Sequence, residues 1–214
     1  MRMNLKNSLK RKKRINFRSI KLNSRNLFIF LISFSIISIL IGILFYFIMS
    51  STDKNTVNNV VEETFKIRDD YNYLLLLKKS ILSNTFNTFL IWILGISVVG
   101  IVFNIFIYFC ELFSVGFTLA SIFSTYNAKG VIGSLAYLFP SKVIYLIVMF
   151  ILTYFSIKFS YKLISVLFMK NDINLKKEMH KYFKVLLFSW IIIIGVSMLN
   201  VFVDPVLIKL FTNI

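Results

Sequence analysis

Long apolar runs, separated by short polar segments, extend from residue 27 to near the end of the chain. The first run, residues 27–49, contains no charged side chain. As an α-helix it would be roughly 35 Å long at about 1.5 Å per residue, which exceeds a hydrocarbon core of about 30 Å. The run is also too long for the core of a signal peptide. The pattern therefore predicts a first membrane-spanning helix over residues 27–49.

Four further apolar runs are interpreted in the same way as spans. They cover residues 86–109, 112–126, 143–168 and 185–203. Glu111 interrupts the apolarity between the second and third spans, and Asp204 with Pro205 ends the last span. The sequence therefore predicts an all-α fold: a polytopic integral membrane helix bundle with about five transmembrane helices.

Residues 130–140 form a shorter apolar segment, which Pro140 ends. The segment is too short to cross a bilayer as a helix. Broken backbone at membrane depth is tolerated only where protein or a water-filled cavity covers it. We therefore expect a re-entrant or interfacial half-helix at residues 130–140.

The polar segments differ in charge. Residues 1–26 carry ten basic side chains and no acid, and residues 169–184 are also basic. Residues 50–85 carry acids and bases in equal number, and the spacing of their apolar positions predicts an amphipathic helix. Because basic loops are retained in the cytoplasm, five spans place 1–26 and 169–184 inside. The 50–85 segment and the tail 204–214 are then extracytoplasmic.

An alternative topology treats residues 112–140 as a hairpin of two spans. It would invert the C-terminal half and move the basic 169–184 segment outside, against the positive-inside rule. Five spans are therefore preferred. One observation disagrees with them, because Lys129 and Lys142 would then lie outside with no acid nearby.

The composition agrees with a membrane protein. Apolar residues make up 57% of the 214 residues and charged residues 16%, whereas soluble domains carry about 25% charged residues. This excludes an ordinary soluble enzyme and a disordered chain. The net charge of +16 is concentrated beside the first span, so we interpret it as a topogenic signal and expect no nucleic acid partner.

Few residues of the chain suit catalysis or metal binding. The sequence contains one cysteine, Cys110, and one histidine, His180. Neither a Cys-based nor a two-His metal site can be built from them, and His180 lies on a predicted cytoplasmic loop. Ser141 and Lys142 are adjacent, which is the wrong geometry for a Ser–Lys dyad. We therefore expect no enzyme activity, no cofactor, no metal and no small-molecule substrate.

Small residues in the spans indicate close helix packing. Gly116, Ala120 and Ser124 are each four residues apart, a spacing that lets another backbone approach. Internal packing is the preferred interpretation, and contact with a partner's membrane helix is the alternative. Gly95 and Gly100 in the predicted second span form a weaker row of the same kind.

Glu111 is the acidic residue closest to the interior of the predicted spans. At the junction of the second and third spans it would be an interfacial carboxylate that faces water. A proton or ion site would need further buried ionisable partners, which the spans do not supply.

Residues 81–118 resemble the core of the stage II sporulation protein M family. The matching residues are Asn84 before the second span, Gly95 and Gly100 within it, and Gly116 with Phe117 early in the third. The later part is also similar: Pro140 ends a short apolar segment, and Pro205 follows the last span. The resemblance covers about residues 27–210. The chain departs from it at Glu111-Leu112 and at Ser141-Lys142.

This resemblance implies a noncatalytic scaffold in the bacterial cell membrane. Members act in endospore formers, where the mother-cell membrane migrates around the forespore during engulfment. They assemble at the septum with two membrane-anchored cell-wall hydrolases, a lytic transglycosylase and an amidase/endopeptidase. The resemblance therefore predicts these hydrolases and the lipid bilayer as partners.

Two other functions compete with the scaffold. A small membrane transporter or permease subunit is the main alternative, because a broken helix at residues 130–140 is typical of transporters. The other is a lipid sensor that uses its basic tail at residues 1–26.

Overall fold

The computed structural model describes residues 23–65, 72–169 and 174–212. In these ranges the chain is helical and contains no strand. The helices are α1 (Ser24–Ile48), α2 (Ser51–Phe65), α3 (Tyr73–Gly95), α4 (Gly100–Tyr126), the 3-10 turn η2 (Asn127–Lys129), α5 (Gly130–Leu138), α6 (Ser141–Met169), α7 (Leu175–Phe202) and α8 (Asp204–Thr212).

The predicted fold class, an all-α membrane helix bundle, is confirmed. Three helical segments in the described part of the chain are long and apolar enough to cross a membrane: Ser24–Ile48, Gly100–Phe168 and Leu175–Ile208. Large apolar side chains point outward along them; Ile36 is 56% exposed and Ile191 is 68% exposed. Lipid rather than water suits such a surface. The number of spans and their orientation stay predictions.

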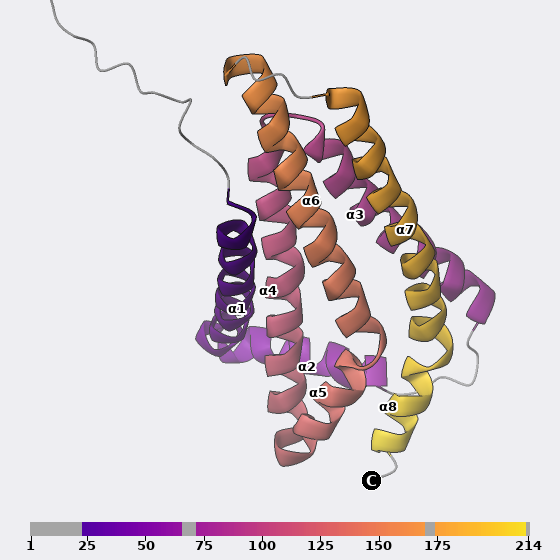
Figure 1. Cartoon of the computed structure of the whole chain (residues 1–214). Coiled ribbons are helices and arrows are strands. Elements are labelled where there is room, and N and C mark those ends of the chain that lie inside the picture. The colour runs from indigo at the N-terminus through magenta and orange to yellow at the C-terminus, as the bar shows by residue number, and fades with distance from the viewer. Residues whose placement is uncertain (1–22, 66–71, 170–173, 213–214) are drawn as a thin grey trace, which may run out of the picture.

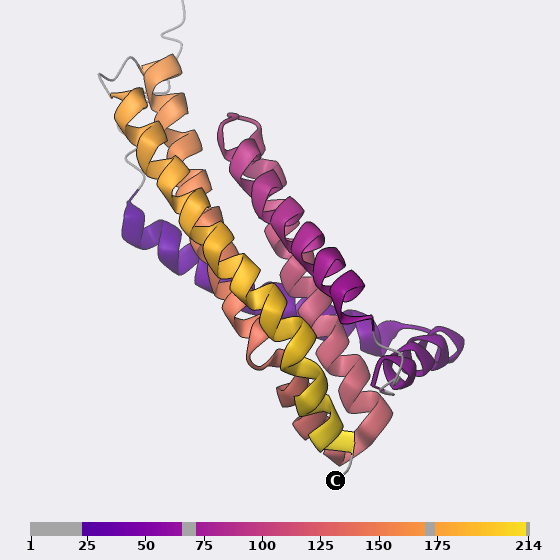
Figure 2. The ribbon, with the colours of Figure 1, turned by 90° about the vertical axis from the view of Figure 1, so that its right-hand side faces the viewer.

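The long helices pack side by side around α4 (Figure 1). Helix α4 contacts α1, α2, α3, α5 and α6, while α7 packs against α3 and α6. Figure 2 shows that α1 is strongly tilted relative to the other long helices. The short helices α2, α5 and α8 gather at one end of the bundle, and the α3–α4 turn lies at the other end.

The hydrophobic core lies between these helices. Leu31 from α1, Ile91 from α3, Met149 and Leu152 from α6, and Ile193 from α7 are all fully buried. Each helix thus buries one stripe and leaves its remaining apolar surface outside. This explains why the periodicity of a soluble amphipathic helix is weak in the long runs.

Asparagine side chains begin three of the long helices. Asn23 accepts a 3.1 Å hydrogen bond from the Arg25 backbone at the start of α1. Asn72 and Asn174 cap α3 and α7 in the same way, with hydrogen bonds of 3.2 and 3.1 Å. Asparagine is favoured at this position because its side-chain oxygen satisfies an otherwise free backbone N–H.

The break between the second and third long helices differs from the sequence expectation of spans over 86–109 and 112–126. Helix α4 runs without interruption through Glu111, and the chain turns earlier, at residues 96–99. Glutamate is a good helix former, so one carboxylate does not end a helix. Gly100 instead permits the tight turn between α3 and α4, because a Cβ atom on it would clash with the Leu94 carbonyl oxygen.

Other boundaries also shift from those of the sequence analysis. The amphipathic helix expected within residues 50–85 corresponds in place to α2, but α3 begins at Tyr73 and takes up the end of that segment. Helix α7 begins at Leu175 and so includes most of the basic 169–184 segment. Helix α8 occupies the expected tail, and α5 lies where the half-helix is expected. Most of the basic tail 1–26 lies outside the described residues.

Candidate functional site

Glu111 lies near the middle of α4 and faces another helix. The Asn87 amide on α3 donates a 2.7 Å hydrogen bond to its Oε1 atom. Asn87 also reaches the Tyr145 hydroxyl on α6, at 3.5 Å. This position differs from the span edge expected from the sequence, because α4 continues on both sides of Glu111. An ionisable residue held between membrane helices is a candidate functional residue.

A second polar contact joins α3, α4 and α6. Asn104 on α4 is fully buried, and its amide donates to the Ser156 hydroxyl on α6. Ser156 in turn donates to the Ile91 carbonyl of α3 at 3.2 Å. One turn further along, Ser160 donates to the Gly95 carbonyl at 2.6 Å. Such bonds between membrane helices fix their relative positions, because lipid offers no alternative partner.

Gly95 and Gly100 lie at the ends of two helices, not inside one span as expected. A Cβ atom on Gly95 would lie 2.2 Å from the Tyr182 hydroxyl oxygen, so this glycine lets α7 approach α3. A Cβ atom on Gly100 would lie 1.7 Å from the Leu94 carbonyl oxygen. The two glycines therefore serve the α3–α4 turn and the packing beside it.

Gly116 packs against α1. A Cβ atom on it would lie 2.1 Å from the Ile39 carbonyl oxygen. Gly42 on α1 is the reciprocal contact, since its Cβ would lie 2.2 Å from the Phe113 carbonyl oxygen of α4. Internal packing, the preferred interpretation of this row, therefore describes Gly116. A partner helix could reach it only after displacing α1.

Ala120 and Ser124, the other residues of the row, and Phe117, which follows Gly116, lie further along α4. Ala120 is buried and Ser124 is partly buried. Phe117 packs its ring edge-on against Tyr46 of α1, with 5.7 Å between the ring centroids. The same face of α4 thus holds the C-terminal half of α1.

Helix α2 is fixed to the bundle by one apolar face. Val61 and Phe65 are buried and form a small cluster with Ile122 of α4. The Tyr46 hydroxyl donates a 2.7 Å hydrogen bond to Asn58, which ties the middle of α2 to the end of α1. Helix α2 is therefore held in a defined position at the end of the bundle.

The opposite face of α2 is exposed and polar. We define the α2 outer face by its exposed side chains, Thr52, Asn55, Thr56, Asn59, Glu62 and Glu63. Glu62 and Glu63 form no ion pair with a described residue. In a chain with a net charge of +16, this face presents two carboxylates.

Three residues that carry the family resemblance connect helices at the α2 end of the bundle. Asn84 on α3 donates a 3.2 Å hydrogen bond to Ser197 on α7. Pro140 directly precedes α6, and Pro205 lies in the first turn of α8. Next to these prolines, the Ser141 hydroxyl donates to the Asp204 carboxylate and joins α6 to α8. Asn84 and Pro205 also line one common pocket.

Sequence reasoning missed the partners of Glu111 and the Ser141–Asp204 contact. One signal was present: Asn84, Asn87 and Thr88 recur at helical spacing and mark a polar stripe on α3. No comparable signal links residues as distant as Ser141 and Asp204. The sequence predicts Asp204 as a helix stop, and the structure also makes it a buried hydrogen-bond acceptor.

Comparison with known proteins identifies the family. The sequence model of stage II sporulation protein M matches residues 27–205, which covers all five long helices in whole or large part. No curated protein and no solved structure matches the chain. The resemblance seen in the sequence is therefore confirmed, and the chain belongs to the stage II sporulation protein M family.

Proposed function

We propose that this protein is a noncatalytic scaffold of the engulfment machinery. It recruits membrane-anchored peptidoglycan hydrolases, a lytic transglycosylase and an amidase/endopeptidase, and holds them at the septum. They then act while the mother-cell membrane migrates around the forespore. Membership of a sporulation family supports the setting. The observation that carries the contact is the α2 outer face, a polar surface on a helix fixed to the bundle.

The proposed topology puts this surface on the cell-wall side. The basic tail 1–26 remains in the cytoplasm, and α1, α3, α4, α6 and α7 cross the membrane in turn. Helices α2, α5 and α8 then share the outer side, since they lie at the same end of the bundle (Figure 1). The outer side is where the hydrolases meet their substrate.

Charge reversal on α2 tests the contact. A Glu62→Lys/Glu63→Lys variant is compared with wild type in co-purification of both hydrolases from sporulating cells. We expect retention to fall about tenfold, the effect of about 1.4 kcal/mol of lost binding free energy. Ser97→Lys adds positive charge to the exposed α3–α4 turn at the other end and serves as the control.

Two results would count against the proposal. Equal retention by the reversed variant would remove α2 from the contact. Absence of both hydrolases from the wild-type preparation, in a membrane extract that contains them, would remove the scaffold itself.

A small transporter or permease subunit is the second candidate, and Glu111 is the observation that favours it. A carboxylate held between helices by Asn87 is a residue type that proton-coupled transporters use. Glu111→Gln separates the two functions. A scaffold keeps sporulation near the wild-type level in this variant, whereas a proton-coupled transporter loses it.

A further inference from the structure

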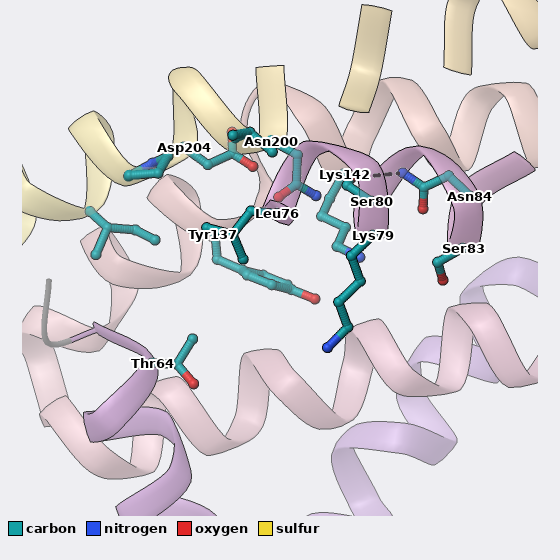
Figure 3. A pocket seen from close by; sticks show the side chains of 13 residues that line it. Thr64, Leu76, Lys79, Ser80, Ser83, Asn84, Tyr137, Lys142, Asn200 and Asp204 are labelled. Carbon is teal, nitrogen blue, oxygen red and sulfur yellow. Dashed lines mark hydrogen bonds between the residues drawn. The ribbon is translucent and has the colours of Figure 1, made fainter. Parts of the chain in front are cut away.

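A pocket of about 420 Å³ opens at the α2 end of the bundle. Side chains from α2, α3, α5, α6, α7 and α8 line it. Figure 3 shows Lys79 of α3, Lys142 of α6 and Tyr137 of α5 directed into the same space. The pocket is separate from the α2 outer face. The α2 residue in its lining is Thr64, near the C-terminal end of the helix, and Thr64 does not belong to that face.

Two lysines give the pocket a positive charge. Neither Lys79 nor Lys142 forms an ion pair with any residue that the structure describes. Lys142 instead has its ammonium nitrogen 5.9 Å from the Tyr137 ring centroid and 5.7 Å from that of Tyr145. These rings hold the ammonium in place and leave its hydrogen-bonding capacity free.

Among the residues that the structure describes in this pocket, one acid, Asp204, accompanies the two lysines. Asp204 is only 9% exposed, and its Oδ2 atom accepts the hydrogen bond from Ser141. Asp204 is the first residue of α8, and its carboxylate contacts Ser141, the first residue of α6. The partial positive charge of a helix N-terminus favours an anion there. With one acid against two bases, the lining keeps one unit of positive charge.

The rest of the lining is divided between polar and apolar groups. The polar groups are hydroxyls and amides, from Thr64, Ser80, Ser83, Asn84 and Asn200. The apolar groups include Leu76, Val201 and Ile208. A ligand that fits both parts is an amphiphile with an anionic head. Lysine ammonium groups and hydroxyls are common ligands of phosphate oxygens.

We propose that this pocket binds the phosphate-bearing headgroup of an anionic phospholipid. Lys79 and Lys142 contact the phosphate, and Leu76, Val201 and Ile208 contact the glycerol and the first carbons of the acyl chains. The pocket lies where the long helices end, which is the depth of the headgroups in a bilayer. The bound lipid touches Thr64 of α2 together with the helices behind it, and so braces α2 on the bundle. The proposal does not depend on the hydrolases.

The test uses the purified full-length chain in a nonionic detergent. Native mass spectrometry measures the fraction that retains one phosphatidylglycerol molecule at increasing lipid concentration. We expect Lys79→Gln and Lys142→Gln each to weaken retention about fivefold. Lys78→Gln is the matched control, because Lys78 is the adjacent lysine of α3 and does not line this pocket. Lys79 is exposed, so its variant is expected to keep the wild-type elution profile in size exclusion.

Separate probes distinguish the parts of the proposal. Retention of phosphatidylglycerol by Lys79→Gln and Lys142→Gln at the level of Lys78→Gln would overturn the site. Equal retention of phosphatidylcholine and phosphatidylglycerol by wild type would overturn the charge argument. Displacement of the lipid by an equal concentration of inorganic phosphate would overturn the lipid as the source of the phosphate.

Discussion

The Asn87 amide donates a 2.7 Å hydrogen bond to the Glu111 carboxylate and so joins α3 to α4. The two residues belong to helices that meet at the tight turn over residues 96–99. Asn87 and Glu111 are both well separated from this turn along their helices. Their hydrogen bond therefore fixes how the two helices face one another away from the turn. It also gives the half-buried carboxylate a polar partner.

Glu111→Ala should destabilise the protein, because it leaves the Asn87 amide without its carboxylate. We expect a loss of about 1–3 kcal/mol, measured by thermal or denaturant unfolding in detergent. Glu111→Gln retains an acceptor and should cost less. Cys110→Ala, at the exposed adjacent position, is the control. Equal stabilities for Glu111→Ala and the control would show that the Asn87 bond contributes nothing.

Glycine variants should separate helix packing from partner binding. Gly116→Ala places a Cβ atom 2.1 Å from the Ile39 carbonyl oxygen, so α1 must move. We expect a loss of about 3 kcal/mol or more. A Cβ on Gly195 of α7 meets nothing within 4 Å, so Gly195→Ala should be neutral or stabilising by up to about 1 kcal/mol.

The measurement asks whether each variant, Gly116→Ala and Gly195→Ala, lowers or raises the free energy of unfolding. Unfolding in detergent gives both, and a neutral Gly116→Ala would contradict the close α1–α4 contact. Loss of hydrolases from a Gly116 variant would not by itself reveal a partner surface, since α1 already covers this glycine.

Glu178 should interact more strongly with one of its two lysine partners than with the other. It pairs with Lys162 of α6 and with Lys181 of its own helix. The Lys162 side chain is 28% exposed and that of Lys181 is 61% exposed. Double-mutant cycles with Gln replacements should give about 1 kcal/mol for Lys162 and about 0.3 kcal/mol for Lys181. The reverse order would contradict the α6–α7 contact.

Single-cysteine labelling tests the proposed topology. Cys110 is the one cysteine of the chain, so Cys110→Ala provides a background free of thiols. In intact cells a membrane-impermeant maleimide should label Asn59→Cys on α2. Ser97→Cys and His180→Cys, both at exposed positions, should react only after permeabilisation. Labelling of His180→Cys in intact cells would favour the hairpin topology instead.

The sequence was sufficient to predict the fold class, because long apolar runs with few charges are typical of membrane-spanning helices. It was insufficient for the α3–α4 turn. Residues 96–99 are as apolar as their surroundings, and the two glycines that flank the turn look the same as glycines inside a helix. Glu111 is the visible interruption of the run, so the sequence predicts the end of the span there.

The sequence also predicts part of the candidate site, namely the residues that a local spacing pattern reveals. Gly116 could be predicted as a packing residue from its spacing, although its contact with α1 could not. The pocket at Lys79 and Lys142 depends on six helices meeting at one end. No local pattern reports such a meeting. In the sequence, Lys142 stands out as a charge that disagrees with the positive-inside rule, and nothing near it points to Lys79.

The central claim, a scaffold for engulfment, is tested most directly by deletion of the gene in its source bacterium. Membrane-dye microscopy through sporulation follows the mother-cell membrane, and a plasmid copy of wild type serves as the complementation control. The account predicts arrest at a flat or bulging septum with the forespore not engulfed. It also predicts rescue by wild type but not by Glu62→Lys/Glu63→Lys. Complete engulfment in the deletion strain at the wild-type frequency would contradict it.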